Sequence, residues 1–308
     1  MLVEALLLPA LFATPLPAAM AASGAPDRPT VGTEILAPES DLDGRDIVLV
    51  TGSTGGLGRE VALRLAAEGA HVLVHGRNRE RGAEVVAEIE KAGVGSARFY
   101  RADFASLDEV RGLAAAVLAD YDRLDALVNN AGIWGREREL SADGHELHFA
   151  VNYLAGYLLT HLLLPRIVDS APSRIVNVAS AAQRPIDFDD PMLERGYDDR
   201  RAYAQSKLAQ VLFTFDLAEE LAGTGVVVTA LHPASLMDTE MVLGRGIRPR
   251  ASVEEGTEAV VRLVVDPEVE TGSYYDGLEQ ARAHPQAYDP EARARLRELS
   301  RELVGLGD

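Results

Sequence analysis

Short apolar runs alternate with longer stretches of helical periodicity along most of the chain, starting near residue 46. The apolar runs occupy residues 47–51, 71–75, 97–101, 126–129, 174–180 and 226–232, with a seventh at 272–275. Helical patterns lie near residues 59–68, 79–92, 107–119, 144–167, 203–222, 252–265 and 290–306. Several runs lack polar alternates, as expected for strands covered on both faces. The pattern predicts an α/β fold, one doubly wound domain with about seven parallel strands, right-handed crossovers and helices on both faces.

Residues 1–44 differ from the rest and are expected to form an N-terminal apolar extension and linker, whereas residues 45–308 form the domain. No charged residue occurs between Ala5 and Pro26. An apolar centre followed by small residues is typical of a signal or anchor, but Glu4 stands where positive charge is usual, and prolines disfavour a spanning helix. A disordered extension or a misplaced start is favoured, and a packed element is a third alternative. We therefore expect a cytoplasmic protein, with export or membrane association through residues 1–25 as the alternative.

Composition and charge exclude several classes of function. The 308-residue chain has a net charge of −18, which argues against a nucleic-acid partner because such a partner needs a basic face. The chain has no cysteine, so disulfides and thiolate metal sites are excluded. Its seven histidines are scattered along the chain, so no metal site is expected. A small molecule is the expected partner, and homo-oligomer formation is left open.

A glycine-rich turn joins the first apolar run to the first helical pattern. Strand, turn and helix in this order are typical of dinucleotide binding, because the start of the helix presents N–H groups to a pyrophosphate. The spacing is G-x-x-x-G-x-G, and such a turn alone could also serve plain chain reversal. The residues expected to contact the cofactor in this Rossmann-type arrangement are Gly52, Ser53, Thr54, Gly56, Leu57 and Gly58.

The residues that end the second strand indicate which dinucleotide binds. A site for the unphosphorylated cofactor usually has an acidic residue here, but this chain has Gly76, Arg77 and Asn78. A guanidinium suits a 2′-phosphate, which favours NADP(H) over NAD(H). A solvated arginine at a helix start is the alternative interpretation.

Two further strand ends extend the expected cofactor site. Asp103 and Phe104 follow the third strand, where the aspartate could reach an adenine edge or cap a helix in competition with Ser106. Small residues after the fourth strand would let the backbone lie beside the cofactor, and the amides there can tie neighbouring strands together. These residues are Asn130, Ala131 and Gly132.

Tyr203 and Lys207 are spaced i, i+4 on a predicted helix and therefore share one face. A nearby ammonium favours the phenolate and lowers the tyrosine pKa, which makes the phenol usable as an acid or base. Ser180 ends the preceding strand, where its hydroxyl could hold a substrate oxygen. The Y-x-x-x-K spacing alone carries little weight, and its value comes from the order of motifs along the chain.

That order resembles the short-chain dehydrogenase/reductase family, and within it the retinol-dehydrogenase-like and WW-domain-oxidoreductase-like branch. The resemblance covers roughly residues 45–305. It rests on residues 51–58, 129–132, 148–152, 158–160, 174–180, 203–209 and 231–233.

The resemblance implies roles for particular residues. Tyr203 would be the proton donor or acceptor, and Lys207 would bind the nicotinamide ribose and lower the tyrosine pKa. Ser180 would orient the carbonyl. Asn152 would hold a water in a proton relay, with a buried helix-bending amide as the alternative. Family members with a basic residue at the position of Arg77 tend to use NADP(H), so the resemblance implies the same cofactor here.

The chain departs from the family pattern after the sixth strand. Pro233 is followed by alanine instead of the usual glycine, and Thr239 lies one position late, so its contact with the cofactor amide is in question. Trp134, the only tryptophan, could be a substrate wall or a packing residue.

The sequence as a whole predicts an NADP(H)-dependent oxidoreductase that interconverts a small to medium, apolar carbonyl compound and its alcohol by hydride transfer. The alternatives are an enzyme of the same fold that uses bound cofactor for epimerisation or dehydration, and a non-catalytic cofactor-sensing protein. The intact set of Asn152, Ser180, Tyr203 and Lys207 disfavours the sensor.

Overall fold

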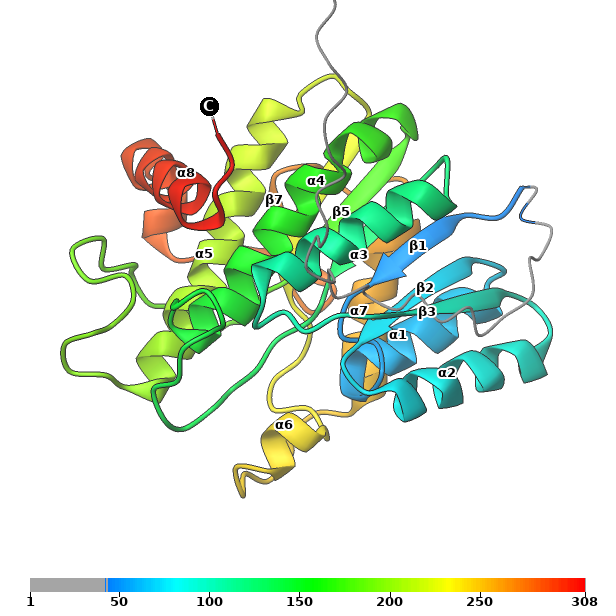
Figure 1. The fold of residues 1–308 in the computed structure, drawn as a ribbon, viewed down its shortest axis with the longest axis horizontal. Helices are drawn as coiled ribbons and strands as arrows, with labels where there is room; N and C mark the ends of the chain where they lie inside the picture. The colour runs from blue at the N-terminus through cyan, green and yellow to red at the C-terminus, as the bar shows by residue number, and fades with distance from the viewer. Residues whose placement is uncertain (1–41, 43, 308) are drawn as a thin grey trace, which may run out of the picture. The chain divides into compact units, whose positions relative to one another are not determined.

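An eight-stranded sheet forms the centre of the part of the chain that the computed structural model describes, residues 42 and 44–307. The strand order is β3-β2-β1-β4-β5-β6-β7-β8 (Figure 1). The strands are β1 (Ile47–Val50), β2 (His71–Gly76), β3 (Ser96–Arg101), β4 (Ala126–Asn129), β5 (Ser173–Val178), β6 (Val226–His232), β7 (Ser273–Asp276) and β8 (Glu279–Ala281). Strands β1 to β7 pair in parallel, which confirms the predicted doubly wound α/β class. Strands β1 to β3 are added toward one edge of the sheet, and strands from β4 onward are added toward the other edge. Strands β1 and β4 therefore lie side by side at the switch point, where such folds bind ligands.

Strand β8 was missed in the sequence because it carries no apolar signal. It pairs antiparallel with β7 at the sheet edge, and it is only three residues long. Glu279 and Gln280 are both exposed, so the period-2 pattern that marks a half-buried strand is not present.

Helices cover both faces of the sheet, as predicted (Figure 1). The elements are α1 (Gly56–Ala67), α2 (Arg79–Ala92), α3 (Leu107–Asp120), η1 (Phe149–Leu154), α4 (Ala155–Asp169), α5 (Asp199–Glu220), α6 (Glu240–Leu243), α7 (Val253–Val265), η2 (Pro285–Tyr288) and α8 (Pro290–Val304). Strand β1 shows how one strand serves both layers. Leu49 belongs to the core cluster that contains residues of α3, α4, α5 and α8, whereas Val48 and Val50 belong to the cluster that contains residues of α1, α2 and α7.

Two of the helices differ from the sequence prediction. Helix α5 begins at Asp199, earlier than the predicted residue 203, because the Asp198 side chain accepts a hydrogen bond from the Arg201 N–H and caps it. The helix predicted at 144–167 contains a π-helical segment, η1, before it continues as α4. The C-terminal α8, predicted as a surface helix, buries one face, including Leu296, on α5.

The predicted extension and linker lie almost entirely outside the described residues. The expectations of a signal, an anchor or a disordered segment for residues 1–25 all concern that part of the chain. Among the residues that the structure describes, no helix is both long and apolar enough to cross a membrane.

Candidate active site

The glycine-rich turn between β1 and α1 is packed so tightly that side chains are excluded at two of its glycines. Gly52 has φ of +66°, and a Cβ atom there would lie 2.8 Å from the Cα of Ala131. A Cβ on Gly58 would lie 2.3 Å from the Asn130 amide nitrogen and 2.5 Å from the Gly52 carbonyl oxygen. The turn therefore requires glycine at both positions, and it presents backbone to the space beyond the strand ends.

Ser53 and His75 hold this turn to strand β2. The Ser53 hydroxyl donates to the Val50 carbonyl at 2.7 Å and accepts from the His75 N–H at 3.0 Å. The His75 ring accepts from the Gly52 N–H at 3.1 Å, and its Nε2 lies 3.2 Å from the Ala102 carbonyl. Burial lowers the pKa of His75 to about 4, so the ring is neutral and its Nδ1 is free to accept. The side chains of Ser53 and His75 thus hold the turn in shape from inside the protein. The sequence did not indicate this role for either residue.

At the end of β2, the structure leaves Arg77 exposed. Its Nη1 lies 3.7 Å from the Asp103 carboxylate, which also accepts from the Ala105 N–H at 3.0 Å. A Cβ on Gly76 would lie 2.6 Å from the Thr54 side chain, so this position is closed to an acidic side chain. A guanidinium is thus available beside the strand ends.

The neighbouring predicted residues have structural partners. Asn78 caps α2 by accepting from the Arg81 N–H at 2.8 Å. Phe104 is buried and stacks on His75 with ring centroids 4.4 Å apart. Ser106, the rival cap considered from the sequence, caps α3. Asn78 and Phe104 can therefore support a cofactor site mainly by fixing its walls.

The segment after β4 is tied to the glycine turn. The Asn130 side chain donates to the Thr51 carbonyl at 2.7 Å, and the Thr51 hydroxyl accepts from the N–H groups of Asn130 and Ala131 at 2.9 Å and 3.0 Å. The Asn129 amide donates to Asn177 on β5 at 2.9 Å. These contacts confirm the expectation that amides here tie neighbouring strands together.

Gly132 brings this segment against two of the predicted catalytic residues. A Cβ atom there would lie 3.3 Å from the Asn152 side-chain oxygen and 3.5 Å from Lys207 Nζ. Asn152, on η1, accepts from the Ile133 N–H at 2.7 Å and donates to the Ser206 hydroxyl at 2.9 Å. The structure therefore joins the end of β4, the η1 segment and α5 in one cluster.

Lys207 is buried on α5, where two acceptors hold its ammonium group. Its Nζ donates to the Val178 carbonyl at 2.7 Å and to Gln210 Oε1 at 2.9 Å. Burial lowers the pKa of Lys207 to about 7. Gln210, one helical turn beyond Lys207, had not been singled out in the sequence, since the i, i+3 spacing by itself is too common to carry a signal.

Tyr203 lies 5.8 Å from the Lys207 ammonium, measured from Nζ to the ring centroid. Burial raises the pKa of Tyr203, and a hydrogen bond from the Ser180 hydroxyl acts in the opposite direction. The lowering that the resemblance assigns to Lys207 would have to exceed the effect of burial, and it stays a prediction. Ser180 itself is placed by the Tyr274 hydroxyl, which donates to the Ser180 carbonyl at 3.1 Å.

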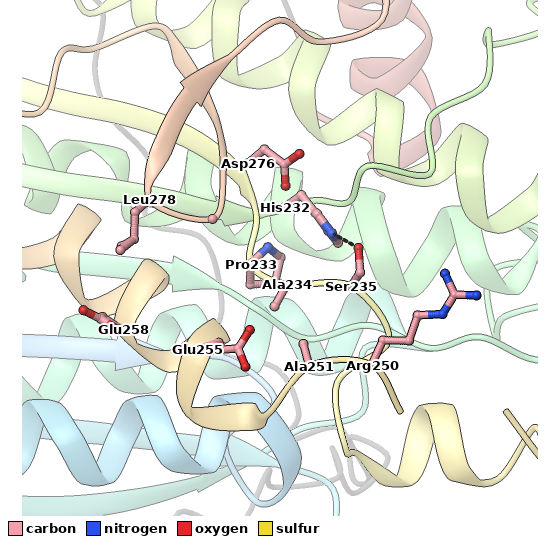
Figure 2. Close-up of a pocket in the computed structure, with 11 residues that line it drawn as sticks. His232, Pro233, Ala234, Ser235, Arg250, Ala251, Glu255, Glu258, Asp276 and Leu278 are labelled. Carbon is pink, nitrogen blue, oxygen red and sulfur yellow. Dashed lines mark hydrogen bonds between the residues drawn. The ribbon is translucent and has the colours of Figure 1, made fainter. Parts of the chain in front are cut away.

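The segment after β6 reaches back over the glycine turn. A Cβ on Gly56 would lie 3.5 Å from the Thr239 methyl group, so Thr239 lies beside the expected cofactor site although it comes one position late. A pocket of about 410 Å³ opens beside the start of this segment (Figure 2). The pocket contains Pro233 and the hydrogen-bonded pair His232 and Ser235, but it contains none of the four predicted catalytic residues.

No group of three or more metal-binding side chains occurs in the described part of the chain. The four residues predicted to be catalytic come from η1, the end of β5 and α5. They lie at the same edge of the sheet as the glycine turn.

Comparison with known proteins identifies the family to which the chain is similar. Residues 46–246 match the family described as short chain dehydrogenase. Retinol dehydrogenase 13 of Mus musculus is 38% identical over 280 residues, which cover 84% of each protein. Among solved structures, a protein from Mycobacterium paratuberculosis has 28% identity and a TM-score of 0.71, covering 89% of this chain and 98% of the other. A variant of actinorhodin polyketide ketoreductase, solved with NADPH, has 28% identity and a TM-score of 0.61, covering 76% of this chain and 97% of the other.

Proposed function

This chain belongs to the short chain dehydrogenase family, and from that premise we propose that it interconverts a carbonyl compound and its alcohol with NADP(H). The family and its retinol-dehydrogenase relatives make it an oxidoreductase that binds a nicotinamide dinucleotide. The observation that carries the finer proposal is the contact between Gly132, Asn152 and Lys207, beside Tyr203 and Ser180. A protein that only sensed the cofactor would not need this group of acids, bases and donors.

The turn and the strand ends fit a dinucleotide. The turn carries no side chain at Gly52, Gly56 and Gly58, so backbone can approach a phosphate closely along this edge. The N-terminus of α1 points its free N–H groups and its positive dipole end toward the same space. When bound, the nicotinamide would supply or accept the hydride.

The chain's own residues would then handle the proton and the substrate oxygen. In the reducing direction, the Tyr203 phenol gives its proton to the substrate oxygen as that oxygen gains charge. The Ser180 hydroxyl donates to the same oxygen and orients the carbonyl. The Lys207 ammonium favours the phenolate that is left, and Asn152 holds the Ile133 segment and α5 in position.

We propose NADP(H) over NAD(H) because of the residues that end β2. Arg77 is two-thirds exposed, with a side-chain exposure of 66%, and its contact with Asp103 is long at 3.7 Å. A guanidinium so placed can bind a 2′-phosphate bidentately. The polyketide ketoreductase solved with NADPH shares 28% identity with this chain, which is consistent with the proposal.

The substrate is proposed to be apolar and small to medium in size, and retinaldehyde is one candidate because relatives are named retinol dehydrogenases. A panel of aldehydes, ketones and alcohols, followed by absorbance of the reduced nicotinamide with both cofactors, tests the reaction and the cofactor together. A strong preference for NAD(H) would overturn the assignment of Arg77.

Tyr203→Phe tests the proton transfer. The variant should keep its cofactor affinity and lose turnover by at least about a hundredfold, the typical contribution of a positioned general acid. Near-normal turnover would refute the mechanism. Tyr197→Phe, which removes another phenol on the segment before α5, is the matched control and should remain active.

Cytoplasmic location and the oligomeric state stay predictions. Fractionation of cells that express the full chain, compared with a chain starting at residue 42, would show whether residues 1–25 bring the protein to a membrane. Light scattering of the purified protein would show whether it is a homo-oligomer.

A further inference from the structure

The segment between Met237 and Ala251 is a small flap carrying α6, which projects away from the sheet (Figure 1). The two ends of the flap are held together. The Asp238 N–H donates to the Ala251 carbonyl at 3.2 Å, and the Arg250 N–H donates to the Leu236 carbonyl at 3.0 Å. Because the base is closed in this way, contacts made farther along residues 238–250 determine where the flap rests.

Arg245 makes most of those contacts on the side of Tyr203. Its guanidinium lies over the Trp134 ring, 4.1 Å from the ring centroid. Its Nη1 donates to the Gly135 carbonyl at 2.9 Å and to the Trp134 carbonyl at 3.3 Å. Its Nη2 forms an ion pair with Asp199, the first residue of α5. The Arg245 side chain is only 13% exposed, so these interactions are protected from solvent.

The charge on Asp199 is adapted to this contact. Burial alone would raise its pKa, but the hydrogen bond and charge of Arg245 lower it, so the pair is ionised at neutral pH. A second ion pair, between Arg81 and Glu240, ties the flap to α2, but both side chains are largely exposed and the pair contributes little. The ion pair of Arg245 is therefore the stronger of these two ion pairs.

Trp134 needs such a contact to stay where it is. Its ring lies 5.3 Å from the Tyr203 ring, measured between centroids. Its indole nitrogen is buried and has no hydrogen-bond partner among the described residues, which disfavours this position relative to one in water. The guanidinium over the indole and the neighbouring Tyr203 ring offset that cost by cation–π and ring contact.

We propose that Arg245 is a positioning residue that clamps Trp134 against Tyr203 and makes the indole a fixed wall, which limits the size of the carbonyl compound that reaches the phenol. The clamp joins three separate segments, the end of β4, the start of α5 and the flap. It selects for small substrates because a bulky one must displace either the indole or the flap. The effect on substrate size rests on the proposed function, because that function supplies the carbonyl substrate. The contact between Arg245 and Trp134 does not depend on the proposed function.

The clamp can be tested without any substrate, because Trp134 is the only tryptophan in the chain. Intrinsic fluorescence therefore reports on this residue alone in the full-length protein. In Arg245→Ala we expect a red-shifted emission and stronger quenching by acrylamide, because the indole is released to water. Arg248→Ala, an exposed arginine of the same flap, is the matched control and should match the wild type. Unchanged quenching in Arg245→Ala would overturn the clamp.

Two further variants guard against a trivial loss of folding. Asp199→Asn keeps the size of the side chain and removes its charge. Arg245→Lys keeps the charge but loses the planar guanidinium, which lies over the Trp134 ring while it also donates hydrogen bonds. Both should increase quenching while circular dichroism stays native. A wild-type response in both would also refute the proposal.

The consequence for specificity is tested with a small and a bulky carbonyl compound. In Arg245→Ala, kcat/KM for the bulky substrate relative to the small one should rise by about tenfold, a typical effect of one altered pocket contact. The change should appear mainly in KM for the bulky substrate, with kcat for the small one nearly unchanged. An unchanged ratio would refute the role in specificity. If Tyr203→Phe kept its turnover, the proposed function would fall while the fluorescence result stood.

Discussion

The buried Lys207 gives a sharp prediction, because the chain contains only one other lysine, Lys91. Burial lowers the pKa of Lys207 from 10.5 to about 7, while the Val178 carbonyl and the Gln210 side chain hold the ammonium group. A difference of this size corresponds to about 5 kcal/mol by which the charged lysine destabilises the folded protein. Replacing Lys207 with methionine should therefore stabilise the fold at low pH while removing activity.

The sign and the pH window follow from the two pKa values. Below about pH 7 the lysine is charged in the folded and unfolded states, and the full cost applies. Between about pH 7 and 10.5 the unfolded chain holds a proton that the folded protein lacks, so wild-type stability rises with pH. The advantage of Lys207→Met should fall by about 3 kcal/mol between about pH 6 and about pH 9. The lost hydrogen bonds subtract about 1–3 kcal/mol at every pH.

Two measurements check this prediction. Nuclear magnetic resonance of protein labelled with ¹³C at the lysine Cε carbons gives two signals, and Lys91→Arg assigns them. Urea unfolding of wild type and Lys207→Met across the same pH range gives the free energies. The reasoning is refuted if the Lys207 signal titrates near 10.5, or if the stability difference between the two proteins does not depend on pH.

Two other substitutions probe the turn and the core. Gly58→Ala would place its Cβ 2.3 Å from the Asn130 amide and 2.5 Å from the Gly52 carbonyl. We therefore expect the variant to bind the dinucleotide at least about tenfold more weakly in a fluorescence titration with the reduced cofactor. Unchanged affinity would contradict the turn's proposed role. Leu296→Ala on the buried face of α8 should lower the unfolding free energy by about 2–5 kcal/mol, whereas Val265→Ala, which is 52% exposed, should change it by less than about 0.5 kcal/mol in the same urea titration. Equal effects of the two would show that α8 does not complete the core.

Much of the fold could be predicted because its signals are local. Parallel strands that are buried on both faces appear in the sequence as continuous apolar runs. The run at β1 is an example, because all four of its residues are apolar and buried in the sheet. The glycine turn could be located for the same reason, since strand, turn and helix follow one another directly. The expectation that amides at the end of β4 tie strands together also succeeded, because Asn129 and Asn177 are paired in register on adjacent strands.

The parts that could not be predicted depend on residues far apart in the chain. Arg245 meets Trp134 across more than a hundred positions, and nothing near either residue marks the pairing. His75 acts through a ring whose neutral state follows from burial, which a strand pattern shows only indirectly. The position of Tyr274 behind Ser180 likewise appears only once β7 is placed beside β6.

The π-helical segment η1 has a consequence for which changes in length the chain can accept. A π turn holds one more residue than an α turn, so Phe149–Leu154 amounts to a single-residue insertion in an otherwise regular helix. Losing one codon here would restore regular spacing and rotate the upstream residues by about 100° relative to α4. Asn152 would then leave Ile133, and His148, which accepts from the Gly135 N–H at 3.0 Å, would turn away from the loop that carries Trp134. This segment should therefore accept no change in its number of residues.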